Sequence, residues 1–243
     1  MENVIVFILA YHAEKTISGV LLDTVKFGRF CGIKEILAID DRSTDGTFSI
    51  MKRIRKGRKN ITIIRNEQNL GYGGNLKKGL DYAIKKNYPI LITLHGDGQY
   101  FPREMHNLLE KLNIDPDIAL VMGSRSNRNL LNSNMPYYKR IGNKILTFIL
   151  NTVYNTSFSE SHSGFRAYRL CFIKKIDYSK FSNDHLFDTQ MLCGLISKGY
   201  KVSEADCSTI YNTDTRSMSF VDDCNYAFGI FTYLVSNFIK GLK

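Results

Sequence analysis

The amino-acid sequence predicts an α/β fold with a mostly parallel central sheet flanked by helices and an elaborated C-terminal third. Short apolar runs alternate with segments of helical periodicity up to about residue 125, as in a strand–helix repeat. The runs are apolar at nearly every position, which is typical of strands that lie inside a parallel sheet with both faces covered. Polar residues gather just after the runs, at the edge where parallel sheets bind their ligands.

Five apolar runs are expected to form the strands of the first half. They are Val4–Ala10, Ile36–Ile39, Ile61–Ile64, Pro89–Leu94 and Ile118–Met122. Helical patterns separate them: one continues to about Phe30, one covers Thr47 to about Ile54, one continues to about Asn87 and one begins near Pro102. Ser43 or Thr44 is expected to cap the second helix, because a hydroxyl there can accept a free N–H of the first turn.

The second half departs from this repeat. It contains a loop rich in Asn and Ser, an amphipathic helix, a polar segment leading into a short strand, another helix, a strand pair or one long strand, and an aromatic-rich amphipathic helix or two short ones. In order, these are Asn127–Asn134, Arg140–Tyr154, Ser161–Arg169, Asp184–Lys198, Tyr200–Tyr211 and Phe220–Ile239. No repeat or linker interrupts the chain, so we expect one domain over residues 1–243.

Composition narrows the class of partner. A formal net charge of +10 favours an anion such as a nucleotide, a phospholipid surface or a nucleic acid. Nucleic acid is the least favoured, because basic residues do not interleave with the C-terminal aromatic residues. The five cysteines are dispersed without a C-x-x-C pair, which argues against zinc and indicates reduced thiols in a cytoplasmic protein. No signal peptide and no run long enough to cross a bilayer is recognised.

The stretch Leu91–Pro102 carries the most chemistry. His95, Asp97 and Gln99 follow an apolar run, and two glycines beside them allow a ligand to approach closely. One interpretation is a site for a cation and a phosphate, since hard cations prefer oxygen ligands. The other is a turn in which Asp97 caps the next helix. Polar residues after three other strands fall on the same edge and favour the cation site. These are Tyr11–Glu14, Asp40–Asp41 and Ser124–Arg125.

A glycine-rich loop, Asn69–Asn75, opens the third helix. Free N–H groups and the positive end of the helix dipole would suit a phosphate there. The spacing matches neither a Walker loop nor the G-x-G-x-x-G fingerprint. A basic run between Lys52 and Lys59 follows the second helix, and we interpret it as a solvated face.

Four separated blocks carry a family resemblance. They are Ala10–Glu14, Asp40–Thr47, His95–Tyr100 and Ser163–Arg166. In this order they resemble the family 2 inverting glycosyltransferases with the GT-A fold, most closely the polyprenyl- or dolichyl-phosphate sugar synthases. The resemblance implies a hexosyltransferase that moves a hexose from a nucleotide-diphosphate sugar to a polyprenyl (dolichyl or undecaprenyl) phosphate at the membrane face. It also implies that residues 1–125 bind the nucleotide sugar and that residues 126–243 form the acceptor side.

The resemblance assigns roles to particular residues. Asp97 corresponds to the last acid of the Asp-x-Asp motif, which holds Mg²⁺ or Mn²⁺ against the diphosphate, and Gln99 stands at the position of a metal-side amide. Arg125 and Arg166 match positions near the acceptor phosphate or the donor diphosphate. The residues expected around the nucleotide sugar are Ala10, Tyr11, Glu14, Asp40, Asp41, Gly71, Gly73, His95 and Gly96.

Two residues depart from the family pattern. His95 stands where the first Asp of Asp-x-Asp is usual. His95 is a candidate metal ligand beside Asp97 and Gln99. Because imidazole binds Mn²⁺ but is a poor ligand for Mg²⁺, the alternative is that Asp97 holds the metal without His95. Glu160 stands where the synthases usually have Asp, and its side chain is one methylene longer.

Two other functions stay open at this point. An acceptor phosphate is already an anion, whereas the hydroxyl of a glycan or polysaccharide would need a general base, for which Asp188 is the candidate. His95 in place of Asp also fits a sugar-nucleotide-binding module that does not catalyse. The leading expectation is a cytoplasmic protein, peripheral at the cytoplasmic membrane face, that meets the lipid directly or through a membrane partner protein.

Overall fold

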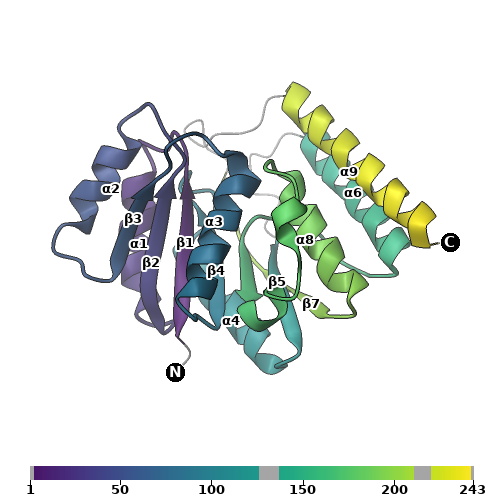
Figure 1. Cartoon of the computed structure of the whole chain (residues 1–243), viewed down its shortest axis with the longest axis horizontal. Helices are drawn as coiled ribbons and strands as arrows, with labels where there is room; N and C mark the ends of the chain where they lie inside the picture. Colours follow the sequence, from purple (N-terminus) through teal and green to yellow (C-terminus); the bar gives the residue numbers. More distant parts are fainter. Residues whose placement is uncertain (1–2, 126–136, 211–219, 242–243) are drawn as a thin grey trace.

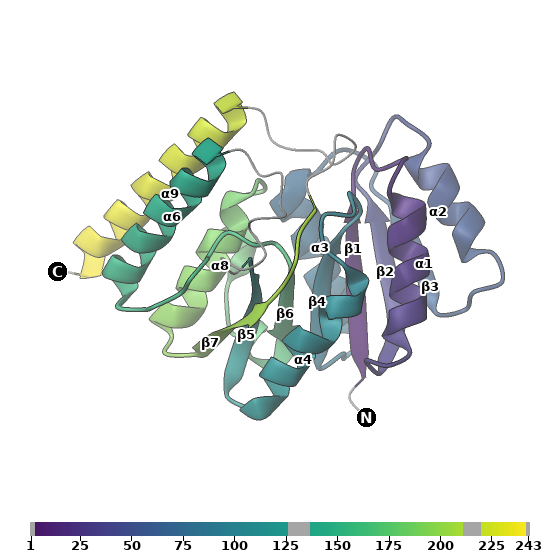
Figure 2. The same ribbon diagram turned by 180° about the vertical axis from the view of Figure 1, so that it is seen from behind.

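The central sheet has seven strands in the order β3-β2-β1-β4-β6-β5-β7 (Figures 1 and 2). The computed structural model describes residues 3–125, 137–210 and 220–241. The strands are β1 (Val4–Ala10), β2 (Ile33–Asp40), β3 (Ile61–Arg65), β4 (Ile90–His95), β5 (Ile118–Ser124), β6 (Arg166–Arg169) and β7 (Lys201–Asp206). Only β6 runs antiparallel to its neighbours, β4 and β5. The predicted α/β fold with a mostly parallel sheet is therefore confirmed.

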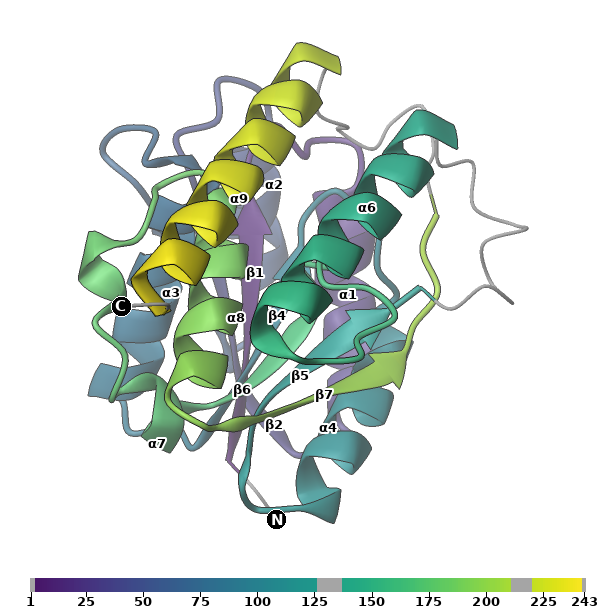
Figure 3. The ribbon, with the colours of Figure 1, turned by 90° about the vertical axis from the view of Figure 1, so that its right-hand side faces the viewer.

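Helices cover both faces of this sheet. They are α1 (Ile17–Gly28), α2 (Thr47–Arg55), α3 (Gly71–Lys85), α4 (Met105–Ile114), α6 (Tyr137–Tyr154), α7 (Leu170–Ile173), α8 (Leu186–Ser197) and α9 (Phe220–Gly241), with single 3₁₀ turns at Pro102–Glu104 and Tyr178–Lys180. One core joins the sheet to α1, α2 and α4. The other joins it to α3, α7 and α8, and α6 and α9 lie side by side beyond α8 (Figure 3).

Strand β1 shows why the continuous apolar runs became central strands. Successive side chains point to opposite faces, so Val6 and Ile8 join the core under α1 while Phe7 and Leu9 join the core under α3. All seven residues of β1 are buried. Burying a side chain of this size is worth about 1.5–3 kcal/mol relative to leaving it exposed, so both faces of the strand favour apolar residues.

The carboxyl ends of the parallel strands meet at the edge that lies uppermost in Figure 1. Strand β1 pairs with β2 on one side and β4 on the other, so Ala10 lies beside Asp40 and Leu9 beside His95. The chain leaves β1 for β2 on one side and later returns through α3 to β4 on the other side. Such a reversal of strand order is where open α/β sheets bind ligands.

The predicted cap of the second helix is wrong. Helix α2 begins at Thr47, and neither Ser43 nor Thr44 accepts an N–H of its first turn. Asp45 takes that place, because its Oδ1 accepts the Thr47 N–H at 3.1 Å and the Thr47 hydroxyl at 2.6 Å. The Ser43 hydroxyl instead accepts the His12 N–H at 3.0 Å and so ties the β1 turn to the β2 turn.

The structure partly corrects the elements predicted for the C-terminal third. Of the strand pair or long strand expected over 200–211, the described part (200–210) contains one strand, β7. The chain then crosses toward the β4 turn, where the Ile210 N–H donates to the Gln99 carbonyl at 3.1 Å. The last helical pattern is one helix, α9, rather than two. The predicted loop 127–134 lies outside the described residues.

Candidate active site

Asp40 and Asp41, at the end of β2, are both buried and have different partners. Asp40 pairs with the Arg65 guanidinium at 3.1 Å, which balances its charge. Asp41 Oδ1 accepts the Asn66 side-chain amide at 2.7 Å and the Leu70 N–H at 2.9 Å. Asp41 is therefore the better candidate for reading a base or ribose, since it is held by neutral N–H donors. Asn66 follows β3 and was not predicted, because a single Asn after a strand is a common turn residue.

The turn after β1 lies at the same edge of the sheet as the end of β2. Tyr11 is 37% exposed and its ring stacks on His12 at a centroid distance of 4.1 Å, so an aromatic surface is open to solvent there. Ala10 contributes backbone, because its carbonyl accepts the Asp41 N–H at 2.8 Å. Glu14 Oε2 accepts the Gly46 N–H at 2.9 Å, so its carboxylate joins the β1 and β2 turns. The three residues predicted here thus lie at the end of β1 and in the turn after it, and two of them, Ala10 and Glu14, bond to the segment after β2.

The glycine-rich segment differs from the predicted phosphate cradle. Gly71 and Gly73 lie in the first turn of α3, and their N–H groups are already used. The Gly71 N–H donates to Asn69 Oδ1 at 2.9 Å, and the Gly73 N–H donates to the Asn183 carbonyl at 2.8 Å. A Cβ on Gly73 would lie 2.5 Å from the Ser182 carbonyl oxygen. Gly73 therefore permits close packing of α3 on the segment before α8, and the expected free N–H groups are absent at both glycines.

The loop after β4 contains the strongest candidate for a cation site. Burial raises the pKa of Asp97 to about 6, and the Gln99 N–H donated to its Oδ1 at 3.0 Å opposes this rise. No ion pair of Asp97 occurs within the described residues. Gly96 anchors the loop, because its N–H donates to the Leu9 carbonyl at 2.7 Å and its carbonyl accepts the Thr16 hydroxyl at 2.7 Å.

This donor set fits a hard divalent cation that also binds substrate. Over residues 3–125, 137–210 and 220–241 no three His, Cys, Asp or Glu side chains gather into a metal cluster. Mg²⁺ is commonly held by one or two carboxylates together with phosphate oxygens and water, rather than by a cage of protein ligands. Asp97 matches this type of site, the Gln99 side-chain amide stays a predicted second ligand, and a bound cation would neutralise the Asp97 carboxylate.

A pH dependence follows for cation binding. The Asp97 carboxyl must lose its proton to bind a cation, so the affinity for Mn²⁺ with a nucleoside diphosphate should fall by about tenfold per pH unit below pH 6. Calorimetry between pH 5 and 8 measures this. The nucleotide phosphates also titrate, so the same series on Asp97→Asn isolates the carboxyl. Parallel curves for the two proteins would contradict the expectation.

Three side chains from distant elements meet beside this loop. Tyr72 Oη, from α3, donates to Asp188 Oδ2, from α8, at 2.8 Å and lies 3.3 Å from His95 Nε2. Burial lowers the pKa of His95 to about 4, so its imidazole is uncharged at neutral pH. A Cβ on Gly164 would lie 2.5 Å from His95 Nε2, so a larger residue there would have to displace the imidazole. His95 Nε2 thus faces the Tyr72 hydroxyl. Only Nδ1 remains for the metal-ligating role that was predicted for His95.

Arg166 is not placed as a direct phosphate contact. Its side chain is fully buried, and its Nε and two terminal nitrogens donate to the carbonyls of Ser163, Asp188 and Ser161 at 2.7, 2.9 and 3.1 Å. Its NH1 also lies 3.7 Å from Asp188 Oδ1. The guanidinium therefore fixes the turn before β6 to α8. The structure thus shows an internal role for Arg166, and a role beside the substrate stays a prediction.

Arg125 lies at the end of β5 and is nearly buried. Its Nε donates to Glu160 Oε2 at 2.8 Å, and a second guanidinium nitrogen pairs with Glu160 Oε1. Glu160, the residue that departs from the family pattern, therefore holds Arg125 at the edge. Glu204 fixes this arrangement, because its Oε1 accepts the Glu160 N–H at 2.9 Å.

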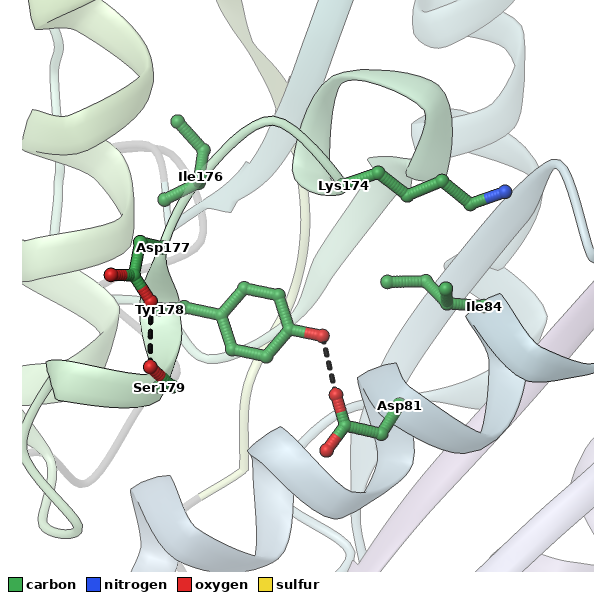
Figure 4. Close-up of a pocket in the computed structure, with 7 residues that line it drawn as sticks. All are labelled: Asp81, Ile84, Lys174, Ile176, Asp177, Tyr178 and Ser179. Carbon is green, nitrogen blue, oxygen red and sulfur yellow. Dashed lines mark hydrogen bonds between the residues drawn. The ribbon is translucent and has the colours of Figure 1, made fainter.

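The pocket in Figure 4 is distinct from this edge. It lies between the C-terminal half of α3 and the segment after α7, and the Tyr178 hydroxyl donates to Asp81 Oδ1 across it at 2.6 Å. None of the predicted site residues lines it. The candidate site is therefore defined by the polar side chains at the carboxyl ends of β1, β2, β4 and β5.

Comparison with known families agrees with this geometry. The model of glycosyl transferase family 2 matches residues 5–176, a span that runs from β1 past β6 and includes the loop after β4. The chain belongs to glycosyl transferase family 2. It is a glycosyltransferase, as the four sequence blocks predicted.

Relatives and solved structures refine this assignment. The chain is 28% identical over 219 residues to the UDP-N-acetylglucosamine–dolichyl-phosphate N-acetylglucosaminyltransferase of Methanococcus voltae, covering 83% of each protein. It is 25% identical over 176 residues to the polyprenol monophosphomannose synthase of Mycolicibacterium smegmatis, covering 72% of this chain and 66% of that protein. The predicted resemblance to the lipid-phosphate sugar synthases is thereby confirmed.

The fold also matches a solved glycosyltransferase. Glucosyl-3-phosphoglycerate synthase from Mycobacterium tuberculosis, crystallised with Mn²⁺, uridine diphosphate and phosphoglyceric acid, superimposes with a TM-score of 0.68. The two chains are 15% identical, and the match covers 98% of this chain and 78% of the other. This likeness supports the predicted GT-A fold.

Proposed function

We propose that this glycosyltransferase moves a hexose from a nucleotide-diphosphate sugar to a polyprenyl phosphate at the cytoplasmic membrane face, with inversion at the anomeric carbon. Residues 1–125 bind the donor and residues 126–243 form the acceptor side of a single domain. The names of the two relatives support the class of acceptor. The structural observation that carries the proposal is an exposed apolar face on the outer helices.

The α6–α9 apolar face consists of large exposed side chains at helical spacing. On α6 they are Tyr137, Tyr138, Ile141, Ile145 and Phe148, and on α9 they are Phe228, Phe231 and Val235. Tyr137, Phe148 and Phe228 are each at least 70% exposed. No described helix is both long enough and apolar enough to cross a bilayer. An amphipathic pair with such a face suits the surface of a membrane.

Charge on α6 agrees with an anionic lipid surface. The helix contains Lys139, Arg140 and Lys144 and no acidic residue; Lys139 already pairs with Asp223 of α9 at 2.9 Å, and Lys144 is exposed. Basic residues near a membrane surface each contribute about 1 kcal/mol of attraction to anionic lipids. Thr147 on the inner side of α6 lies 3.2 Å from the Ser161 hydroxyl, so this helix joins the segment that leads into Arg166.

The side chains at the edge support direct displacement by an acceptor phosphate. Such an acceptor is an anion and needs no general base. Asp188, the candidate base for a hydroxyl acceptor, already accepts the Tyr72 hydroxyl and pairs with Arg166. Tyr11 and Asp41 would bind the nucleoside, and Asp97 with Gln99 would hold Mg²⁺ or Mn²⁺. A bound cation would stabilise the negative charge that develops on the leaving diphosphate.

The test is transfer from a panel of labelled nucleotide sugars to polyprenyl phosphate in detergent with Mn²⁺. A sugar-labelled lipid phosphate with inverted anomeric configuration is the expected product. A glycan hydroxyl acceptor is offered in parallel, and transfer only to it would overturn the lipid part of the proposal. Nucleotide binding without transfer or donor hydrolysis would indicate a non-catalytic binding module instead.

Membrane binding is expected to depend on the α6–α9 apolar face. Replacing both Ile145 and Phe148 by Glu removes two exposed apolar side chains, each worth about 1.5–3 kcal/mol when buried. We therefore expect binding to vesicles of anionic phospholipid to weaken by at least about tenfold. Co-sedimentation with vesicles measures this. Phe30→Glu is the control, because Phe30 is 85% exposed but follows α1. Equal losses in both variants would contradict a role for this face.

A further inference from the structure

Tyr72 lies beside the loop after β4, and its sequence context assigns it no role beyond its place in the glycine-rich segment. It belongs to the first turn of α3, and its ring stacks on His185 at a centroid distance of 4.4 Å. Its edge meets His95, with ring centroids 5.5 Å apart and planes at 76°. Its hydroxyl touches both His95 and Asp188. Tyr72 is therefore the one described side chain that bridges the loop after β4 and helix α8 in this way.

The direction of the two hydrogen bonds follows from simple counting. A phenol has one proton, and Asp188 Oδ2, at 2.8 Å, can only accept it when ionised. With its proton donated to Asp188, the Tyr72 oxygen can only accept from His95 Nε2, at 3.3 Å, so this nitrogen carries the imidazole proton. Burial and the Asp188 charge raise the pKa of Tyr72 well above its usual value, so the phenol keeps its proton.

We propose that Tyr72 is a positioning residue: its hydroxyl orients the Asp188 carboxylate and fixes His95 in the tautomer with the proton on Nε2. This inference rests on the proposed function, since it takes the edge around Asp97 as the place of glycosyl transfer. His95 then presents its lone pair on Nδ1. A metal-ligating histidine commonly has its other ring nitrogen fixed by a hydrogen bond. Tyr72, held by Asp188, would fix the tautomer and ring orientation of His95 in the same way.

The packing around the site separates this role from a purely structural one. Helix α3 is held to the segment before α8 by other bonds, in which Gly73 and Gly74 donate N–H groups to the Asn183 carbonyl. Lys77 Nζ adds bonds to the Ser179 and Phe181 carbonyls. None of these bonds involves the Tyr72 hydroxyl. Removing the hydroxyl while keeping the ring should therefore leave the docking of α3 intact.

Gly164 supports the same assignment. A Cβ at this position would lie 2.5 Å from His95 Nε2 and 2.8 Å from Tyr72 Oη, so a side chain there would separate the two groups. The backbone of the Ser163–Arg166 block thus passes directly over the contact between them. On the β6 side, the hydrogen bond between Tyr72 and His95 is therefore covered by a glycine, which leaves room for both groups.

The test compares Tyr72→Phe with Tyr82→Phe. Tyr82 lies on the same helix and donates an equivalent hydrogen bond, to Glu35 at 2.7 Å, but far from the edge. We expect Tyr72→Phe to lower kcat by about 10- to 100-fold, with a smaller change in KM for the donor, because a misplaced group loses its alignment rather than its binding. Tyr82→Phe should retain the kcat of the unmodified enzyme.

Two readouts separate positioning from general damage. Long-range ¹⁵N–¹H correlation on histidine-labelled protein reports the tautomer of His95, with its signals assigned by their loss in His95→Asn. The proton is expected on Nε2 in the unmodified protein and shared between both nitrogens in Tyr72→Phe. The kcat losses of Tyr72→Phe and Asp188→Asn should also be non-additive in the double variant, since both break one chain of hydrogen bonds.

Each outcome decides the proposal. Unchanged His95 tautomer in Tyr72→Phe, fully additive kcat losses, or an equal loss in Tyr82→Phe would overturn it. The tautomer is measured without any substrate. If the unmodified enzyme fails to glycosylate polyprenyl phosphate while the tautomer still depends on Tyr72, the proposed acceptor is wrong and the positioning of His95 stands.

Discussion

Asp97→Asn is expected to reduce glycosyl transfer by about 10²–10³-fold while leaving the protein folded and at least as stable at neutral pH. Burial raises the pKa of the Asp97 carboxyl to about 6, so the native state disfavours its charged form. This cost is present above pH 6 and disappears as the carboxyl is protonated at lower pH. An amide of the same shape removes the cost and also removes the charge that would hold a cation.

The measurement pairs transfer rate with chemical unfolding at pH 7.5. Loss of rate together with retained or increased unfolding free energy is the pattern of a residue kept for function at a cost in stability. Asp23→Asn is the matched control, because Asp23 is exposed on α1 and should change neither quantity. If Asp97→Asn instead lowers the free energy of unfolding enough to explain its loss of activity by unfolding, Asp97 is a structural cap of the β4 turn.

Much of the fold could be predicted because each central strand carries its own signal. The runs at β1, β2, β4 and β5 are apolar on both faces, and only a covered sheet buries such runs. A short strand was expected near β6, but its pairing with β4 and β5 could not be predicted. It is four residues long and has an arginine at each end, and its place between β4 and β5 depends on contacts with residues far away in the sequence.

Site residues that come directly after a predicted strand could be predicted from the sequence. Asp41 and Asp97 needed only the rule that parallel strands gather their ends at one edge. Tyr72 was missed because its partners lie 23 and 116 residues away, and nothing local shows that α3 and α8 meet. The glycines of α3 were misinterpreted for the same reason, since the carbonyl that uses the Gly73 N–H belongs to Asn183.

Arg166 shows that a matching motif does not reveal what surrounds a residue in the fold. The block around it resembles the family, and a free arginine beside a diphosphate would be sensible chemistry. In the structure, however, its guanidinium is buried and bonded inside the protein. Burial alone would lower the pKa of Arg166, but Asp188 and nearby tyrosines raise it, so the guanidinium stays charged inside the protein. Three backbone carbonyls and one carboxylate then surround that charge.

Arg166→Met is accordingly expected to destabilise the fold by about 3–5 kcal/mol, because it leaves Asp188 buried without its cation and three carbonyls without a donor. Arg166→Lys should recover only part of this loss, since one ammonium cannot reproduce the planar set of donors. Urea unfolding measures both. Arg29→Met, at an exposed position beside α1, should stay within about 0.5 kcal/mol of the unmodified protein.

A second substitution separates the charge from the carbonyls. Asp188→Asn placed in the Arg166→Met background removes the uncompensated carboxylate and should restore part of the lost stability, whereas the same change in the unmodified protein should destabilise it. That reversal of sign is expected only if the two charges compensate each other inside the fold. If Arg166→Met keeps the free energy of unfolding of the unmodified protein but no longer binds a nucleoside diphosphate, Arg166 contacts the substrate after all.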